Sequence, residues 1–244
     1  MLSVAIAILL AVAMLVLVAG LGWRIARYTA TPVPLAIPTM PAPLTRAGAA
    51  ARVGREVVLF ESLFGADKLL WVAAMLFHVG LLLVLLRHLR YVFPTPPLLI
   101  VLVQPFGKLG ALAMMAGALL LLVRRLALPR VRFISRPSDI AMLLLLLAIG
   151  ATGLAMTYFI HTDIIGLKQF LAGLPLLELR PLPDDPMLSL HLGLAAALLI
   201  VLPFSKLLHI PGVFFSSTRN QADDSRDRRR LAPWARTLDG ARHG

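Results

Sequence analysis

The chain has 244 residues, of which 59% are hydrophobic and 15% are charged, and its mean hydropathy is +0.86. Soluble domains are about half apolar and about 25% charged, so this composition excludes an ordinary soluble domain and indicates a membrane protein. The lack of cysteine excludes a thiolate-held iron–sulfur cluster, a covalently attached c-type haem, a disulfide framework and a cysteine nucleophile within this chain. A redox metal held here would need histidine as its main protein ligand.

Five apolar stretches reach the length of about 20 residues that a helix needs to cross the hydrocarbon core of a membrane. The first has no basic region before it and no convincing cleavage site, so we interpret it as a span rather than a signal peptide. We expect an all-α fold, an integral membrane bundle of five transmembrane helices within residues 1–212, and a polar cytoplasmic tail over 213–244. The expected spans are approximately residues 2–23, 69–91, 98–123, 139–160 and 187–208.

The basic residues indicate how these spans are oriented. Six, five and eight Lys or Arg residues lie in 24–68, in 124–136 and from 206 onward, whereas the two other connections together hold four. The positive-inside rule therefore places the N-terminus outside and the C-terminus in the cytoplasm. Because the cations lie at the ends of apolar runs, membrane topology explains the net charge of +12 better than nucleic-acid binding does.

Two connections and the tail have distinct compositions. The proline-rich segment 29–43 is expected to be extended. Residues 52–64 are expected to form a short helix on the inner membrane surface. The tail sequence "NQADDSRDRRR" is polar and densely charged, which predicts an unfolded segment unless a partner orders it.

Four of the six histidines lie within the expected spans, and their spacing predicts two pairs. His78 and His88 are ten residues apart in the second span, and His191 and His209 are eighteen apart in the fifth. Eighteen residues make five full helical turns, so the second pair points in one direction. Since the two spans run in opposite directions, His78 is expected near His209 on the cytoplasmic side and His88 near His191 on the outer side. His161 and His243 are interpreted as solvated residues, although His161 could also line an outer site.

Paired imidazoles at two depths suit two haem groups, with two axial histidines each. An unpaired imidazole in hydrocarbon is costly, and a bond to iron removes that cost. A single membrane histidine is explained more simply by an interhelical hydrogen bond, but four in two antiparallel pairs favour haem. Zinc would need a tetrahedral ligand cluster. Gly80 and Gly193, near the ligands, are expected to admit a flat ring, and Pro203 is expected to bend the fifth helix.

Three motifs resemble the respiratory nitrate reductase gamma subunit (NarI-like) family over roughly residues 69–212. They are "LFHVG" with His88 ten residues after His78, "LHLGLAAALLIVLPFSKLLHIPG", and "RRLALPRVRFISRPSDI" before the fourth span. The resemblance implies a dihaem cytochrome b in which His78 and His209 hold an inner haem b. It likewise implies that His88 and His191 hold an outer haem b.

The resemblance also implies a quinone site beside the outer haem, formed by His88 and Lys108. Lys108 lies in the third span, twenty residues after His88. Taken alone, Lys108 could be a lysine that extends to the interface, but an ionisable group within a membrane is by default a functional candidate. No catalytic residue is predicted, because the chain is expected to serve as an electron-transfer subunit with quinol or quinone as substrate.

Within this family, the proline-rich segment, "ESLFGADKLLW" and "PGVFFSSTRNQ" resemble the DsrM group of membrane cytochrome b subunits. This likeness implies a bacterial inner-membrane complex of dissimilatory sulfur metabolism. Its implied partners are a DsrK-like cytoplasmic iron–sulfur subunit of heterodisulfide-reductase type, DsrJ-, DsrO- and DsrP-like subunits, and, indirectly, the sulfur carrier DsrC.

Three alternatives stay open at this stage. The chain could be the gamma-type subunit of a nitrate reductase or a related respiratory complex. It could be a haem-free transporter that uses its histidines and Lys108 as a proton or metal path. It could also be a haem-free anchor that only recruits a soluble enzyme.

Overall fold

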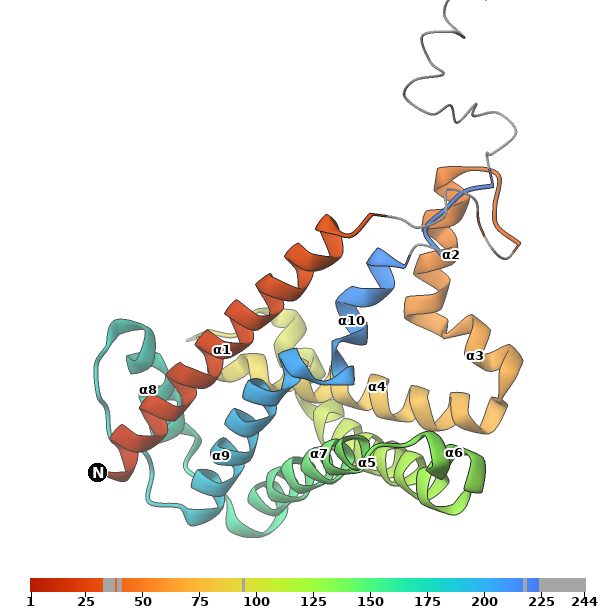
Figure 1. Ribbon diagram of the computed structural model, residues 1–244. Helices are drawn as coiled ribbons and strands as arrows, with labels where there is room; N and C mark the ends of the chain where they lie inside the picture. Colours follow the sequence, from red (N-terminus) through yellow and green to blue (C-terminus); the bar gives the residue numbers. More distant parts are fainter. Residues whose placement is uncertain (33–37, 39–40, 94, 217–218, 224–244) are drawn as a thin grey trace, which may run out of the picture. The chain divides into compact units, whose positions relative to one another are not determined.

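The computed structural model describes residues 1–32, 38, 41–93, 95–216 and 219–223. Over these residues it is helical and contains no strand, as expected for an all-α fold. The α-helices are α1 (Leu2–Ala30), α2 (Arg46–Leu59), α3 (Glu61–Ala66), α4 (Lys68–His88), α5 (Leu98–Ala127), α6 (Pro129–Ile134), α7 (Pro137–Ala155), α8 (Ile164–Gly173), α9 (Pro186–Val201) and α10 (His209–Gly212). Figure 1 shows their order along the chain.

Five helices among the described residues are long and apolar enough to cross a membrane, which confirms the expected number of spans. Three of them continue past their α-helical part: α4 into a 3₁₀ turn, α7 into the π-helical turn Met156–Ile160, and α9 into the 3₁₀ turn Leu202–Phe204. The complete segments are Leu2–Ala30, Lys68–Tyr91, Leu98–Ala127, Pro137–Ile160 and Pro186–Phe204.

The chain divides into two compact units. The first comprises Met1–Arg24 and Leu63–Leu208 and contains most of the apolar helices, whereas the second comprises Ile25–Ser62 and His209–Gly244. In the first unit α4 packs along α5, α5 packs against α7, and α7 packs against α9 (Figure 1).

Glycines let α4 and α5 approach at backbone contact. A Cβ atom at Gly80 would lie 2.5 Å from the carbonyl oxygen of Gly110 and 2.5 Å from the backbone nitrogen of Met114. A Cβ atom at Gly117 would lie 2.5 Å from the backbone nitrogen of Phe77. The expectation that Gly80 admits a cofactor ring is therefore wrong, because this glycine faces α5. Close packing through small residues is the usual way in which membrane helices associate.

Ion pairs join the helix ends at one end of the first unit. Asp67 caps the first turn of α4 and accepts a hydrogen bond from Arg124, near the end of α5, at 3.0 Å. Asp139, at the start of α7, accepts hydrogen bonds from Arg125 at 3.4 Å and from Lys206 at 2.7 Å. The start of α4, the end of α5, the start of α7 and the segment after α9 therefore lie together.

The other end of the first unit is joined by a second set of contacts. The carboxylate of Asp185 caps α9 and accepts a hydrogen bond from Thr162, just after α7, at 2.6 Å. The backbone N–H of Leu182 donates to the hydroxyl of Ser3, at the start of α1, at 3.1 Å. Consecutive spans therefore run in opposite directions, as the count of basic residues assumed.

The fifth span is shorter than expected. Its α-helix ends at Val201, continues as a 3₁₀ turn through Leu202–Phe204, and stops at Ser205, whose backbone is extended. Pro203 lacks the N–H that would continue the helix, and its fixed φ favours such an end. The prediction that His191 and His209 lie on one continuous helix is therefore wrong, and so is the argument that five whole turns align them.

The second unit is held together by polar and aromatic contacts. The chain leaves helical geometry at Phe60, which has a φ of 50°, and this residue separates α2 from α3 in the segment predicted to be one short helix. Arg219 pairs with Glu56 of α2 at 2.8 Å, and the ring centres of Tyr28 and Phe215 are 5.6 Å apart. Residues 33–37, 39 and 40 of the proline-rich segment and most of the charged tail lie outside the described residues.

Candidate functional site

Two of the four predicted ligand histidines face each other in the first unit. His88 is the last residue of α4, and His191 lies in the second turn of α9. The centres of their imidazole rings are 6.3 Å apart, and the ring planes are inclined by 15°. The structure thus brings these two side chains together, and their binding of a haem stays a prediction.

Each of these rings has its Nδ1 atom occupied by an oxygen. The Nδ1 atom of His88 lies 2.7 Å from the carbonyl oxygen of Val84, and the Nδ1 atom of His191 lies 2.9 Å from the hydroxyl of Thr152. A carbonyl oxygen can only accept a hydrogen bond, so Nδ1 of His88 carries the proton. Its Nε2 atom then keeps a free lone pair, which is the form in which histidine binds a metal.

His78, ten residues before His88 in α4, has the same local arrangement. Its Nδ1 atom lies 2.8 Å from the carbonyl oxygen of Ala74, and its ring stands edge-on to Phe77 with the ring centres 5.1 Å apart. Its predicted partner His209 begins α10 and belongs to the second unit. The pairing of His78 with His209 therefore stays a prediction.

The separation of the His88 and His191 rings fits a shared metal. A bond between a metal and an imidazole nitrogen is about 2 Å, and the nitrogen lies about 1 Å from its ring centre, so two such ligands in line have centres about 6 Å apart. Two aromatic rings in direct contact can also have centres about 4.5–7 Å apart. The near-parallel rings fit either arrangement, and the Nδ1 bond of His88 leaves Nε2 as the atom through which that ring would bind a metal.

A site built from two histidines suits haem better than a bare ion. Among the residues that the structure describes, no three or more His, Cys, Asp or Glu side chains group closely enough to hold a metal ion. A porphyrin supplies four nitrogens of its own and needs only two axial ligands from the protein. The donor set of His88 and His191 therefore fits haem.

Lys108 lies on α5 at the depth of His88. A Cβ atom at Gly107 would lie 2.5 Å from the side chain of Arg87, so α4 and α5 meet at these two residues. Lys108 and His88 are the next residues in the two helices, and they therefore lie at the same depth. The ammonium of Lys108 is exposed and lies 5.7 Å from the ring centre of Tyr158. Tyr158 belongs to the π-helical turn that ends the fourth span, a geometry that is common at functional sites.

A polar network adjoins the end of α4 that carries His88. Arg87 donates to the carbonyl oxygen of Gln104 at 3.1 Å, and Arg90 donates to the hydroxyl of Tyr91 at 2.8 Å. The ring of Tyr91 stands 5.8 Å from that of His88, centre to centre. These contacts fix the end of α4 against the start of α5, and with it the position of His88.

His161 directly follows the π-helical turn. Its φ is 57° and its side chain is exposed, as expected for a solvated residue.

The cap of α9 adds electrostatic support six residues before His191. Burial raises the pKa of Asp185, but the hydrogen bonds from Thr162 and from the backbone N–H groups of Leu188 and Met187 outweigh this and lower it below its ordinary value. The ionised carboxylate therefore stabilises the first turn of α9. An ionised Asp185 thus helps to fix the direction in which this helix presents His191.

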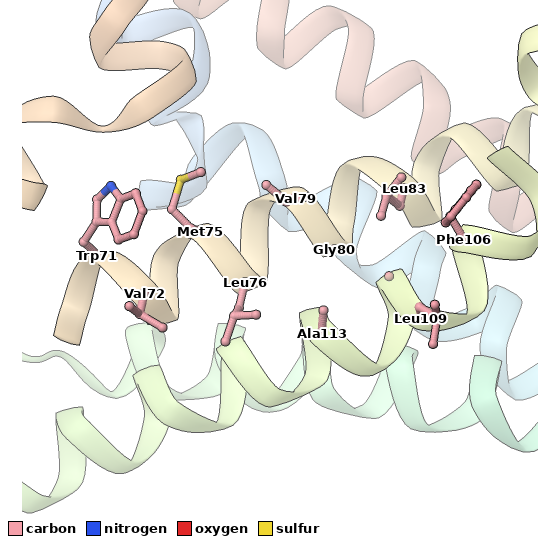
Figure 2. A pocket seen from close by; sticks show the side chains of 11 residues that line it. Trp71, Val72, Met75, Leu76, Val79, Gly80, Leu83, Phe106, Leu109 and Ala113 are labelled. Atoms are coloured by element: carbon pink, nitrogen blue, oxygen red, sulfur yellow. The ribbon is translucent and has the colours of Figure 1, made fainter. Parts of the chain in front are cut away.

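An apolar hollow of about 540 Å³ lies between α4 and α5. Figure 2 shows its lining, with Trp71 toward one end and Phe106 toward the other. Leu109 and Val79, two of its wall residues, are 64% and 46% exposed, so the hollow opens on the outer surface of the helix pair. It contains none of the predicted ligands, and it is separate from the site around His88 and His191.

Thr152 is the site residue that sequence reasoning missed. It is buried within an otherwise apolar helix, α7, and touches His191 from a different span. The sequence feature that could have indicated it is a hydroxyl residue in the middle of a membrane span, because a hydroxyl in that environment needs a hydrogen-bond partner. Spacing along the chain gave no reason to join it to a histidine 39 residues away.

Comparison with known proteins places the chain among membrane electron carriers. Residues 60–222, which include all four predicted ligands, match the family described as nitrate reductase gamma subunit. The chain is 34% identical to the Hdr-like menaquinol oxidoreductase cytochrome b-like subunit of Archaeoglobus fulgidus, over 91% of this chain and 81% of that protein. It is 30% identical to the protein of the same description from Archaeoglobus profundus, over 90% and 79%.

Proposed function

Because the chain belongs to the nitrate reductase gamma subunit family, we propose that it is the cytochrome b subunit of a membrane quinol oxidoreductase and carries two haem b groups. Five apolar helices and this family make it a multi-pass membrane protein. The observation that carries the proposal is the His88–His191 pair, two imidazole rings from different spans whose centres are 6.3 Å apart.

The four histidines divide into an outer and an inner ligand pair. His88 and His191 hold the outer haem through Nε2, and His78 and His209 hold the inner one. Haem b supplies a one-electron couple within the membrane when it is bound. The chain's contribution is to orient the four imidazoles and, in His88 and His78, to hold the ring proton on Nδ1 against the carbonyl oxygens of Val84 and Ala74.

The quinone binds near the outer ligand pair, with Lys108 as its hydrogen-bond donor. An ammonium has three N–H groups and can donate one to a quinone carbonyl oxygen. In His88 the Nδ1–H is bonded to Val84 and Nε2 is assigned to iron, which leaves no N–H for a quinone. His88 therefore adjoins the quinone without bonding it, and Lys108 is the residue that recognises the carbonyl group.

A cytoplasmic iron–sulfur subunit exchanges electrons with the inner end of the chain. The connection after α5 contributes the short helix α6, on which Arg130, Arg132 and Phe133 are exposed. This basic surface with an aromatic residue suits an acidic partner. We propose that the N-terminus is outside and the C-terminus cytoplasmic, which places α6 on the side of that partner.

The partner is of heterodisulfide-reductase type rather than a nitrate reductase. Two observations support this assignment: both relatives are described as Hdr-like, and the tail sequence "PGVFFSSTRNQ" resembles the DsrM group. The complex then joins the quinone pool to dissimilatory sulfur metabolism through DsrK-like and DsrC-like proteins, with DsrJ-, DsrO- and DsrP-like subunits. Electrons can flow in either direction along the same ligand pairs.

A difference spectrum of the purified protein tests the cytochrome assignment. The reduced-minus-oxidised spectrum should show b-type bands, and a short-chain menaquinol should reduce them. A transporter or a haem-free anchor would show no such bands, and that result would end the proposal.

Co-purification tests the choice of partner. The tagged chain from its native host should retain an iron–sulfur subunit of heterodisulfide-reductase type. Charge reversal at α6, with R130E and R132E together, should weaken this retention, whereas R180E, in a connection assigned to the opposite side, should not. Recovery of nitrate reductase subunits instead would show that the chain is the gamma-type subunit of a nitrate reductase.

A further inference from the structure

Thr152 joins two membrane spans through one hydroxyl group. The residue lies in α7 and is 8% exposed. Its hydroxyl oxygen lies 3.0 Å from the carbonyl oxygen of Ala148, 2.9 Å from that of Ile149, and 2.9 Å from the Nδ1 atom of His191 on α9. All three neighbours are within hydrogen-bond distance.

The direction of these hydrogen bonds follows from the number of protons. A hydroxyl has one proton to donate, and the carbonyl oxygens of Ala148 and Ile149 can only accept. We assign the hydroxyl proton of Thr152 to a carbonyl oxygen of its own helix, so that its oxygen lone pair accepts the bond from Nδ1–H of His191. This places the proton of His191 on Nδ1 and leaves Nε2 as a base.

His191 differs in this respect from the other two ligands whose contacts are known. His78 and His88 donate to carbonyl oxygens four residues earlier in their own helix, which is a main-chain feature that no substitution removes. His191 instead has a side chain from another span within hydrogen-bond distance, together with a backbone hydrogen bond to Ile149 of that same span. Its ring also lies against Gly153, where an added Cβ atom would be 3.4 Å from Cε1.

We propose that Thr152 is a positioning residue for His191, which fixes its tautomer and the rotation of its ring toward the outer haem. This inference rests on the proposed haem ligation by His191. Partners of a metal-bound histidine raise the basicity of the ring and hold its orientation, and their loss typically costs about 10–100-fold in metal affinity. Without Thr152, the Nδ1–H of His191 would lose its acceptor at 2.9 Å and would keep only the backbone carbonyl of Ile149.

The test compares T152V with T152S and T157V. Valine keeps the shape of threonine without its hydroxyl, whereas serine keeps the hydroxyl. Thr157 is the matched control, because its hydroxyl makes the same kind of bond to a backbone carbonyl, that of Gly153 at 2.9 Å, with no histidine on it in the described contacts. The inner haem reports whether each variant is folded.

Two readouts apart from activity are measured on the purified full-length protein: the rate at which each haem transfers to apomyoglobin, and the midpoint potential of each haem. In T152V we expect the outer haem to leave at least about 10-fold faster and its potential to rise, because a less basic imidazole stabilises ferric iron less. The inner haem should be unchanged, T152S should restore wild-type values, and T157V should match wild type.

The outcomes separate this inference from the proposed function. If the wild-type protein holds two haems and T152V behaves like T157V on both readouts, Thr152 has no positioning role while the function stands. If the wild-type protein holds no haem, the proposed function fails and the role of Thr152 fails with it. If T152V also loses the inner haem while T152S does not, the residue supports the whole bundle, and the specific assignment to His191 is overturned.

Discussion

Replacement of Gly80 by alanine should separate α4 from α5. The new Cβ atom would lie 2.5 Å from two backbone atoms of α5, whereas ordinary contact begins at 3.4 Å, so the helices must move apart by nearly 1 Å. Overpacking of this kind costs about 1–3 kcal/mol, and backbone atoms on both sides place this site at the upper end. Alanine regains about 1 kcal/mol of helix propensity. We therefore expect a net loss of about 2 kcal/mol, which lowers Tm by about 4–8 °C for a chain of this size.

Gly22 provides the matched control for this experiment. It lies in α1, and a Cβ atom there would meet nothing within 4 Å. G22A should therefore leave Tm unchanged or raise it slightly, through helix propensity alone. Thermal unfolding of both variants is followed by tryptophan fluorescence in one detergent. If G80A is as stable as G22A, α4 and α5 do not meet at backbone contact, and the packing of the first unit is wrong.

Three further changes probe the ends of the spans. K108M should slow reduction of the b bands by menaquinol at least about 10-fold and leave their reduction by dithionite intact, because only the quinone contact is lost; equal rates with menaquinol would remove Lys108 from the quinone site. D185A should lower the free energy of unfolding by about 0.5–2 kcal/mol, because it removes the cap of α9 and the hydrogen bond from Thr162. An unchanged Tm would show that the cap is dispensable. The pKa of Asp67 is held below its usual value, first by a hydrogen bond from a first-turn backbone N–H of α4 and then by one from Arg124. The stabilisation by the ionised Asp67 is therefore complete above about pH 4, and it is lost as the pH falls toward the pKa of the folded state. D67N should flatten that acid dependence of Tm, and an equal acid dependence in wild type and D67N would contradict this account.

The number and approximate position of the spans could be read from the sequence, because each span is a run of apolar residues long enough to cross a membrane. Helix ends were less predictable. The helix α1 continues to Ala30 through a polar stretch, and α9 stops before Ser205, where proline outweighs hydrophobicity. The helix α8 was missed, although Asp163 caps it, because ten residues are too few to register as a span.

The ligand pair could be predicted in part. His88 and His191 meet because antiparallel spans of similar length bring the same depth together, which is a property of spacing alone. The support from Thr152 could not be predicted in this way, since it depends on the rotation of α7 relative to α9. Likewise, the assignment of Gly80 to helix packing depends on which face of α4 meets α5.

We propose that one haem iron would be held by both His88 and His191. Haem b per chain, measured by the pyridine haemochrome method on wild type, H88A, H191A and the double variant, tests it most directly. We predict two haems in the wild-type protein and one in each of the three variants, because the second substitution removes nothing further. Two haems retained in either single variant, or none left in the double variant alone, would contradict the claim.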